Sequence, residues 1–390
     1  MPKFVESDAN PQVPPPYRFP DVNSHAFLFD IPLHYVQAYC DRYLNLGDAK
    51  DRGFVYRPYP LFPHAAFIVL EYPAMIPEAQ EPPSPGAMQM KDYGFANQNE
   101  FLAVFPVIRH GTTPETFLSN MVLEWATPLV VVNNSSSAIS GREILGMDKI
   151  YGLVDVAEQS VLAGFMGEVC LRAAPTTLSD NTTNMMKFVT IETGPPAPSI
   201  GRTANAKSAW SLLGSRQANA ALQALAAAFV GLDDVAGGLI PNPMRIVMLK
   251  QIRDTNDAGQ AVYQALVGAR CRYSNVSKIQ FYNENDVRLR VRADGPFSAL
   301  WAPFVGPDNS TPLQEADSSG HGQVREWLEL RTRMAVSFKA TIDTDDVREL
   351  HDFLRPGARP RGMLAPCLRP LAGFLGAANP AADAPHSAGD

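Results

Sequence analysis

Proline is the residue that most constrains the fold of this chain. The 390 residues include 34 prolines and 27 glycines, and this proline share lies well above the roughly 5% of an average protein. Proline is excluded from helix interiors and from central strands because it lacks a backbone N–H and its ring clashes with the preceding turn. The composition therefore disfavours a helical bundle and predicts many turns and loops.

The prolines gather in four stretches that suggest how the chain is organised. An Ala-rich segment with helical spacing, residues 207–232, lies between two of them. We expect one elaborated β-rich domain with additions. Its parts are a Pro-rich arm at 1–22, a core at 23–310 with a helical insertion at about 195–243, a C-terminal strand and helix packed on the core at 311–355, and a Pro/Ala/Gly-rich tail at 356–390.

Between the prolines, apolar residues alternate with polar ones or form short runs, which is typical of β-strands. Strands are expected at 67–72, 100–108, 128–134, 161–173, 185–193, 244–252, 261–273, 286–293 and 333–342. Helices are expected at 33–46, at 113–121 and, because of an Asp/Thr cap and an acidic first turn, at 343–354. The predicted fold class is α+β, mainly antiparallel β, with peripheral helices.

Charge and hydropathy exclude several classes of protein. The 33 Lys and Arg residues against 40 Asp and Glu give a net charge of −7, which argues against a protein that binds the phosphate backbone of nucleic acids. The sequence has no run of about 18 apolar residues and no apolar signal region near its first residues. We therefore expect a cytoplasmic protein with no nucleic-acid and no membrane partner.

The cysteines and histidines stand singly along the chain. None of the 4 cysteines forms C-x-x-C, and none of the 7 histidines forms H-x-H or H-E-x-x-H, so no metal site is expected. Phosphate-loop, dinucleotide-binding and G-x-S-x-G motifs do not occur either. Nothing in the motif content favours an NTPase, a dinucleotide enzyme or a serine hydrolase.

One stretch, VVVNNSSSAISGREILGMDKIYG at residues 130–152, joins an apolar strand to a polar turn and then to a lysine with apolar neighbours. If the Lys149 amine is buried there, desolvation disfavours its charged form and lowers its pKa. A lysine that forms an imine needs that free amine. From residue types alone, the commoner arrangement is a lysine that reaches solvent beside a structural Arg142–Glu143 ion pair.

The same stretch resembles the acetoacetate decarboxylase superfamily, whose members carry Gly-Arg-Glu, four variable residues, Pro and then Lys-Lys. Here Gly141-Arg142-Glu143 is followed by four residues, Asp148 and Lys149. QNEFLAVFPV at 98–107 and MLKQIRDTNDAGQAVYQALVGARCR at 248–272 are similar to two further segments of that family, in the same order.

The resemblance covers roughly residues 23–305 and implies a cone-shaped, closed β-sheet core. It also implies a lysine that forms a Schiff base with the substrate, which makes Lys149 the nucleophile. Glu100 takes the place of the family's active-site carboxylate and is expected to act as general acid and base. On residue type alone, a solvated carboxylate at a strand end is as good an interpretation of Glu100.

The remaining expectations concern support and assembly. Arg142 and Glu143 are expected to hold the loop, and Tyr151 either donates a hydrogen bond in the site or belongs to the core. The resemblance implies self-association into a homo-oligomer. No metal or organic cofactor is expected, because the lysine supplies the electron sink once the imine has formed.

Three positions depart from the family pattern. Ile150 stands where the family has its second lysine, Asp148 stands where it has proline, and Asp30 lies near the place of an arginine that binds the substrate carboxylate. Acetoacetate itself is therefore not the substrate that we expect. The predicted activity is that of a lyase acting on a keto acid or related carbonyl compound through an imine and an enamine.

Three alternatives stay open. The first is an aldolase or dehydratase that uses the same imine, and the second is a non-catalytic small-molecule-binding protein on the same fold, since a fold does not fix a function. The third is an interaction protein whose Ala-rich helix and Pro-rich ends build an oligomer.

Overall fold

The structure is a computed structural model. It describes residues 12–60, 62–78, 97–119, 121–156, 168–173, 186–195, 244–282, 284–294, 301, 304–316 and 324–354. The helix expected at 207–232 and the tail expected at 356–390 lie outside the described residues.

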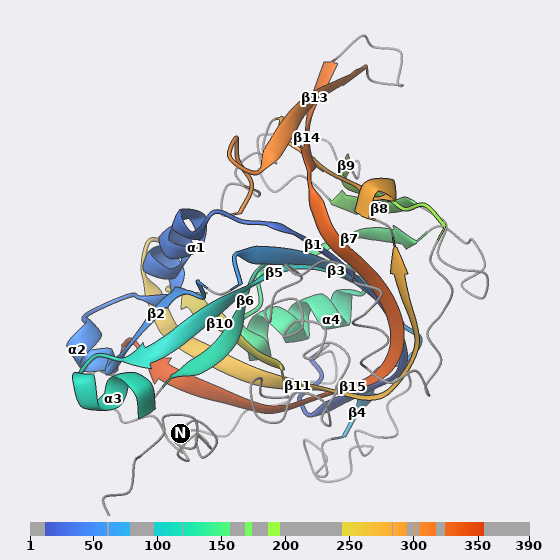
Figure 1. Ribbon diagram of the computed structural model, residues 1–390. Helices are drawn as coiled ribbons and strands as arrows, with labels where there is room; N and C mark the ends of the chain where they lie inside the picture. Colours follow the sequence, from blue (N-terminus) through green and yellow to red (C-terminus); the bar gives the residue numbers. More distant parts are fainter. Residues whose placement is uncertain are drawn as a thin grey trace, which may run out of the picture.

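The core is a sheet that closes on itself, as predicted (Figure 1). Its neighbours run in the order β6–β10–β11–β15–β1–β3–β5 and return from β5 to β6. All of these pairs are antiparallel except β6–β10, which is parallel. The strands are β1 (Tyr17–Asp30), β3 (His64–Tyr72), β5 (Gln98–Gly111), β6 (Val122–Val132), β10 (Met244–Arg253), β11 (Ala261–Tyr282) and β15 (Thr332–Asp352).

The sheet forks at β6. At Trp125 and Ala126 this strand pairs with β10, whereas from Val130 to Val132 the same edge pairs with β7, which begins at Lys149. From β7 a second branch of the sheet continues through β8, β9, β12 and β14 to β13. Its strands are β7 (Lys149–Val156), β8 (Glu168–Ala173), β9 (Met186–Glu192), β12 (Arg288–Arg292), β13 (Ser310–Ala316) and β14 (Val324–Leu330).

Short strands and helices complete the described part. β2 pairs with β5, and β4 pairs with β1. The elements are β2 (Phe54–Pro58), β4 (Ile76–Pro77), α1 (Leu33–Tyr39), the π-helical turn η1 (Cys40–Leu44), α2 (Ala49–Arg52), α3 (Pro114–Ser119), α4 (Ser135–Ser140), the π-helical turn η3 (Gly141–Leu145) and the 3₁₀ turn η5 (Glu284–Asp286). None of the helices in the described part of the chain has the length and apolar character that a bilayer crossing requires.

Both faces of the closed sheet are buried, which explains the continuous apolar runs in its strands. In β3, Phe67 and Val69 face an outer cluster that also contains Trp301. Ile68 and Leu70 of the same strand face an inner cluster. Figure 1 shows α4 within the curve of the sheet rather than on its periphery, where we expected the helices.

The helix predicted at 343–354 is wrong, because β15 continues through this segment to Asp352. The Asp and Thr side chains that resemble a helix cap serve cross-strand contacts instead. Arg270 on β11 forms ion pairs with Asp345 at 3.0 Å and with Asp346 at 3.1 Å. The long pairing of β11 with β15 supplies the backbone hydrogen bonds of this segment, and tertiary context thereby overrides local helix propensity.

The start of the chain also differs from expectation. β1 begins at Tyr17, inside the segment assigned to the Pro-rich arm, and pairs with β15 on one side and β3 on the other. The preceding residues stay attached to the core, because the Val13 N–H donates to Ser140 Oγ at 2.8 Å and Tyr17 Oη donates to the Val13 carbonyl at 2.5 Å.

Substitution of Phe67 by alanine is expected to lower the free energy of unfolding by about 3–5 kcal/mol. Phe67 is fully buried, and its ring lies 4.7 Å from that of Phe29 and 5.0 Å from that of Phe101, so truncation leaves a cavity. Urea unfolding measures the loss. Phe117→Ala is the matched control, since Phe117 is 42% exposed and its loss should change stability far less. Equal effects of the two substitutions would contradict this assignment of the core.

Candidate active site

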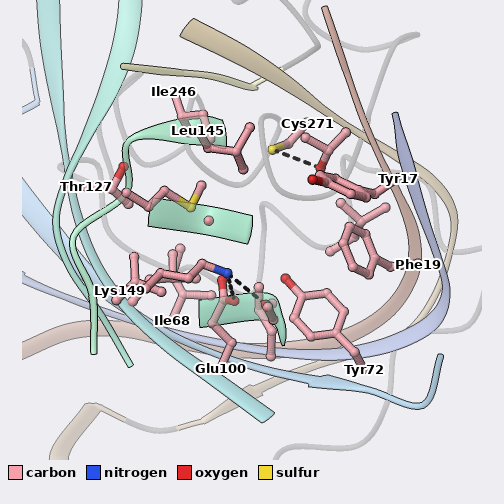
Figure 2. A pocket seen from close by; sticks show the side chains of 18 of the residues that line it. Tyr17, Phe19, Ile68, Tyr72, Glu100, Thr127, Leu145, Lys149, Ile246 and Cys271 are labelled. Carbon is pink, nitrogen blue, oxygen red and sulfur yellow. Dashed lines mark hydrogen bonds and ion pairs between the residues drawn. The ribbon is translucent and has the colours of Figure 1, made fainter. Parts of the chain in front are cut away.

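A cavity of about 90 Å³ lies on the inner side of the closed sheet, and Figure 2 shows Lys149 and Glu100 at its wall. Its walls are mostly apolar, with a few polar groups that converge on the space, the usual character of a small-molecule site. The lining residues are Tyr17, Phe19, Ile68, Leu70, Tyr72, Met75, Gln98, Glu100, Leu102, Val104, Thr127, Val130, Ser137, Ser140, Gly141, Leu145, Met147, Lys149, Met244, Ile246, Cys271, Tyr273, Ile342 and Thr344.

Lys149 and Glu100 form a buried ion pair. Lys149 Nζ donates to Glu100 Oε2 at 2.7 Å and to Ser137 Oγ at 3.1 Å. Both charged side chains are only 7% exposed. Among the alternatives considered above, the solvent-exposed lysine and the solvated carboxylate are therefore both wrong.

The fork in the sheet brings these two residues together. Lys149 is the first residue of β7 and pairs with Val130, while Glu100 lies on β5 opposite Val132, on the other edge of the same strand β6. Residues 49 positions apart in the sequence thus meet across one strand.

The two asparagines of the NNSSS sequence fix the turn that follows β6. Asn133 Oδ1 accepts from the Asn99 backbone N–H at 2.8 Å, which ties this turn to β5 beside Glu100. Asn134 is the N-cap of α4, and its Oδ1 accepts from the Ser137 N–H at 3.0 Å. A capped first turn determines where Ser137 lies, and its hydroxyl is the one that the Lys149 amine reaches.

The GRE sequence begins a π-helical turn, and the glycines at its start and directly after its end, Gly141 and Gly146, each leave room for a lysine. A Cβ on Gly141 would lie 2.5 Å from Lys149 Cδ, so any other residue here would displace the Lys149 side chain. Gly146 ends the turn at φ +78°, a conformation that favours glycine, and a Cβ there would also collide with Lys250. Turns of this kind occur frequently at functional sites.

The other three predicted site residues lie away from the cavity. Arg142 is exposed, but its guanidinium donates to the Lys149 carbonyl at 3.0 Å and so supports the start of β7. Glu143 is exposed, and Tyr151 is 52% exposed, so neither is among the described residues that line the cavity. Asp148 is exposed as well. Asp30 is bound to His64 and Arg333, outside the cavity lining.

Several polar groups of the cavity were missed from the sequence. Gln98 is 4% exposed, and its Nε2 donates to Glu100 Oε2 at 3.5 Å. Figure 2 shows the Tyr72 hydroxyl pointing into the same space as the Lys149 amine. The alternation of side chains along a strand could have identified Gln98, because it lies two residues before Glu100 and therefore on the same face of β5. Nothing in the sequence marks Tyr72.

Burial changes the acidity of the cavity hydroxyls and of its thiol. The pKa of Tyr72 is raised well above its ordinary value by burial and by the nearby Glu100 carboxylate. Burial likewise raises the pKa of Tyr273, and raises that of the Cys271 thiol to about 11. All three groups therefore keep their protons at neutral pH. Among the described residues, no three His, Cys, Asp or Glu side chains are grouped as metal ligands.

No protein-family model and no curated protein sequence matches the chain. Solved structures are similar to it at low sequence identity. Acetoacetate decarboxylase from Legionella pneumophila subsp. pneumophila str. Philadelphia 1 is 10% identical, with 91% of this chain and 93% of that chain covered, at a TM-score of 0.48.

Two further solved structures of enzymes give similar values. The enduracididine biosynthesis enzyme MppR, complexed with the condensation product of pyruvate and imidazole 4-carboxaldehyde, is 11% identical over 89% of this chain and 93% of that chain, at a TM-score of 0.49. An acetoacetate decarboxylase-like enzyme from Sphingomonas wittichii RW1 is 11% identical over 86% and 93%, at 0.43. All three TM-scores lie below 0.5, so the chemistry of this chain is inferred from its own residues.

Removal of one partner of the buried ion pair is expected to be costly, and removal of both much less so. Glu100→Gln leaves the Lys149 ammonium without its counter-ion and should lower the free energy of unfolding by about 3–5 kcal/mol. The double variant Glu100→Gln/Lys149→Met should recover most of that loss. Denaturant unfolding of the single and double variants measures the coupling between the residues.

A surface ion pair supplies the control for this cycle. Arg272 lies 3.2 Å from Asp345, with side chains 50% and 33% exposed, so Arg272→Met should change stability by no more than about 1 kcal/mol. A double variant whose loss equals the sum of the single losses would contradict a coupled buried pair.

The Cys271 thiol should react slowly with iodoacetamide while the protein is folded. At pH 8 a thiol with a pKa of about 11 holds about a hundredfold less thiolate than one at the ordinary value of 9.0. Because the raised pKa favours the protonated form, the reaction rate should rise about tenfold per pH unit from pH 7 to pH 9. Peptide mass mapping, with the urea-unfolded chain as reference, measures it. A native rate at pH 8 equal to the unfolded rate would contradict the prediction.

Proposed function

We propose that this protein is an enzyme that forms an imine between Lys149 and a small carbonyl compound. The observation that carries the proposal is the buried contact between the Lys149 amine and the Glu100 carboxylate, 2.7 Å apart at the wall of the cavity. An amine nucleophile and a base within hydrogen-bond distance of each other are the two groups that imine chemistry requires.

Glu100 activates the nucleophile. Only a free amine attacks a carbonyl carbon, and transfer of one proton from Lys149 Nζ to Glu100 Oε2 gives that amine and a neutral carboxylic acid. The transfer turns two buried charges into two neutral groups and leaves the total charge unchanged, so it places no unpaired charge in the apolar surroundings. Ser137 Oγ, 3.1 Å from Nζ, keeps the amine in place while its charge changes.

The bond changes that follow are those of imine chemistry. The Nζ–C bond forms while the carbonyl oxygen takes the proton from Glu100, and loss of that oxygen as water gives the imine. In its protonated form the imine accepts the electron pair of a breaking bond at the adjacent carbon, which yields an enamine. A proton returned to that carbon and hydrolysis by water release the product and the free amine. Because the protonated imine itself accepts the electron pair, the proposed reaction needs no further cofactor.

The finer class that we propose is a lyase, with cleavage of a C–C or C–O bond next to the carbonyl and a small-molecule carbonyl compound as partner. Arg142 acts as a positioning residue, because its hydrogen bond to the Lys149 carbonyl holds the backbone from which the nucleophile projects. Glu143 and Tyr151 have no part in this proposal, since their side chains are exposed.

Sodium borohydride should reduce the imine to a stable secondary amine on Lys149. The full-length protein is incubated with a panel of ketones, aldehydes and oxo acids and then reduced, and the adduct is located by intact mass and peptide mapping. A mass increase that depends on the carbonyl compound and maps to Lys149 is the expected result. Lys149→Met should reduce trapping to background while the protein remains folded by circular dichroism.

A second lysine provides the matched control. Lys250 lies on β10 next to η3, and burial lowers its pKa, so its amine is the other plausible nucleophile of this region. Lys250→Met should leave trapping within about twofold of the wild-type value, because Lys250 does not line the cavity among its described residues. Adducts that map to Lys250, or the absence of any adduct with a folded protein, would refute the enzyme proposal and favour a non-catalytic binding protein.

A further inference from the structure

The charges at the cavity wall compensate each other. Lys149 and Glu100 form a close pair, and the other described residues that line the cavity are uncharged at neutral pH. When the amine becomes a protonated imine, its positive charge stays beside Glu100, which remains its counter-ion. A substrate carboxylate would add a negative charge to this balanced pair, and burial of an unpaired charge is strongly unfavourable. Only protonation of Glu100 would restore the balance, and that removes the base.

Gln98 adds an electronegative group next to Glu100. Its Nε2 is turned toward Glu100, and its Oε1 is buried with no hydrogen-bond partner among the described residues. An amide oxygen accepts hydrogen bonds but cannot donate them. The side of the cavity that holds Glu100 therefore presents acceptor oxygens to a ligand, and these repel a carboxylate and suit a neutral molecule.

Tyr72 supplies a neutral donor across the same space. Figure 2 shows its hydroxyl directed into the cavity, and no hydrogen bond of this hydroxyl occurs within the described part of the chain. The hydroxyl keeps its proton, because burial and the Glu100 carboxylate raise its pKa. A protonated phenol donates one hydrogen bond, which satisfies an ether, ester or second carbonyl oxygen without a formal charge.

The remaining walls limit the size and polarity of the ligand. Phe19, Ile68, Leu102, Ile246 and Ile342 give the cavity aliphatic and aromatic surfaces. At about 10–15 Å³ for each water-sized group, the volume of about 90 Å³ takes on the order of six to nine non-hydrogen atoms.

We infer that the substrate is a small uncharged carbonyl compound, a ketone or aldehyde with aliphatic substituents and a second neutral oxygen that accepts a hydrogen bond from Tyr72. An oxo acid, the broader class expected from the sequence resemblance, is disfavoured by the charge balance of the cavity. The inference rests on the proposed imine chemistry of Lys149.

Acetoacetate and methyl acetoacetate form a matched pair of probes, since they differ only by the methyl group that removes the charge. Borohydride trapping of the full-length protein with each probe gives a rate of adduct formation on Lys149. Each rate is divided by that of Nα-acetyl-lysine under the same conditions, which removes the difference in intrinsic reactivity. We expect the ester to be preferred by about tenfold or more, a difference of about 1.4 kcal/mol.

The outcomes separate the substrate class from the chemistry on which it rests. Equal or faster trapping of acetoacetate on Lys149 would overturn the uncharged-substrate inference and leave the imine proposal standing. A mass that corresponds to trapped acetone counts in the same way, since it reports an acid that entered and lost carbon dioxide. Failure of both probes to form an adduct would overturn the inference together with the proposed function.

Tyr72→Phe tests the neutral hydrogen bond. Methyl acetoacetate has a second oxygen for the Tyr72 hydroxyl, whereas butanone has none. The variant should slow trapping of the ester by about threefold to tenfold more than it slows trapping of butanone. Equal slowing of both probes would indicate a structural role for Tyr72 and overturn its hydrogen bond to the substrate.

Discussion

The contact between Lys149 and Glu100 is the interaction on which the arrangement of this molecule's interior depends. Two opposite charges, each almost fully buried, are favourable only if they stay within hydrogen-bond distance of each other. That requirement fixes β5, which carries Glu100, against the start of β7, which carries Lys149, with β6 between them. It also fixes α4, because Ser137 accepts a hydrogen bond from the same amine. A displacement of β5 or of β7 would leave a buried charge without its partner.

The fork at β6 explains how a closed sheet can hold such a site. A closed sheet of this size has an interior that side chains fill or that holds one small ligand. Here β6 exchanges one neighbour, β10, for another, β7, within five residues. The chain between β6 and β7 enters at this fork as α4 and η3, and Leu145 of that segment belongs to the inner apolar cluster. The closed sheet therefore contains a helical segment in which Ser137 of α4 contacts the amine and Leu145 of η3 packs on the core. The connection from β6 to β7 thus supplies both a residue that contacts the Lys149 amine and a residue of the apolar core.

Much of this fold could be predicted from the sequence, because strands buried on both faces read as continuous apolar runs, as in FIVLEY and EFLAVFPVI. The pairing of Lys149 with Glu100 followed from sequence resemblance and not from their spacing, since only the fork brings them together. The helix prediction for 343–354 was wrong because the Asp and Thr residues fit a helix cap locally, whereas their partners on β11 lie more than 70 residues away in the sequence. Tyr72 and Ser137 could not be recognised for the same reason. Ordinary polar residues become part of a site only through tertiary pairing.

Strand geometry accounts for the isoleucine at position 150, where the family that the sequence resembles has its second lysine. Successive side chains in a β-strand point to opposite faces. Lys149 faces the cavity, and Ile150 accordingly packs against the outer apolar cluster of the sheet. A lysine at position 150 on this strand would place its charge toward that cluster instead of beside Lys149. In this chain a neighbouring cation therefore cannot come from the next residue, and the charged group beside the Lys149 amine is the Glu100 carboxylate. The close pair of Lys149 and Glu100 keeps the charges at the cavity wall balanced.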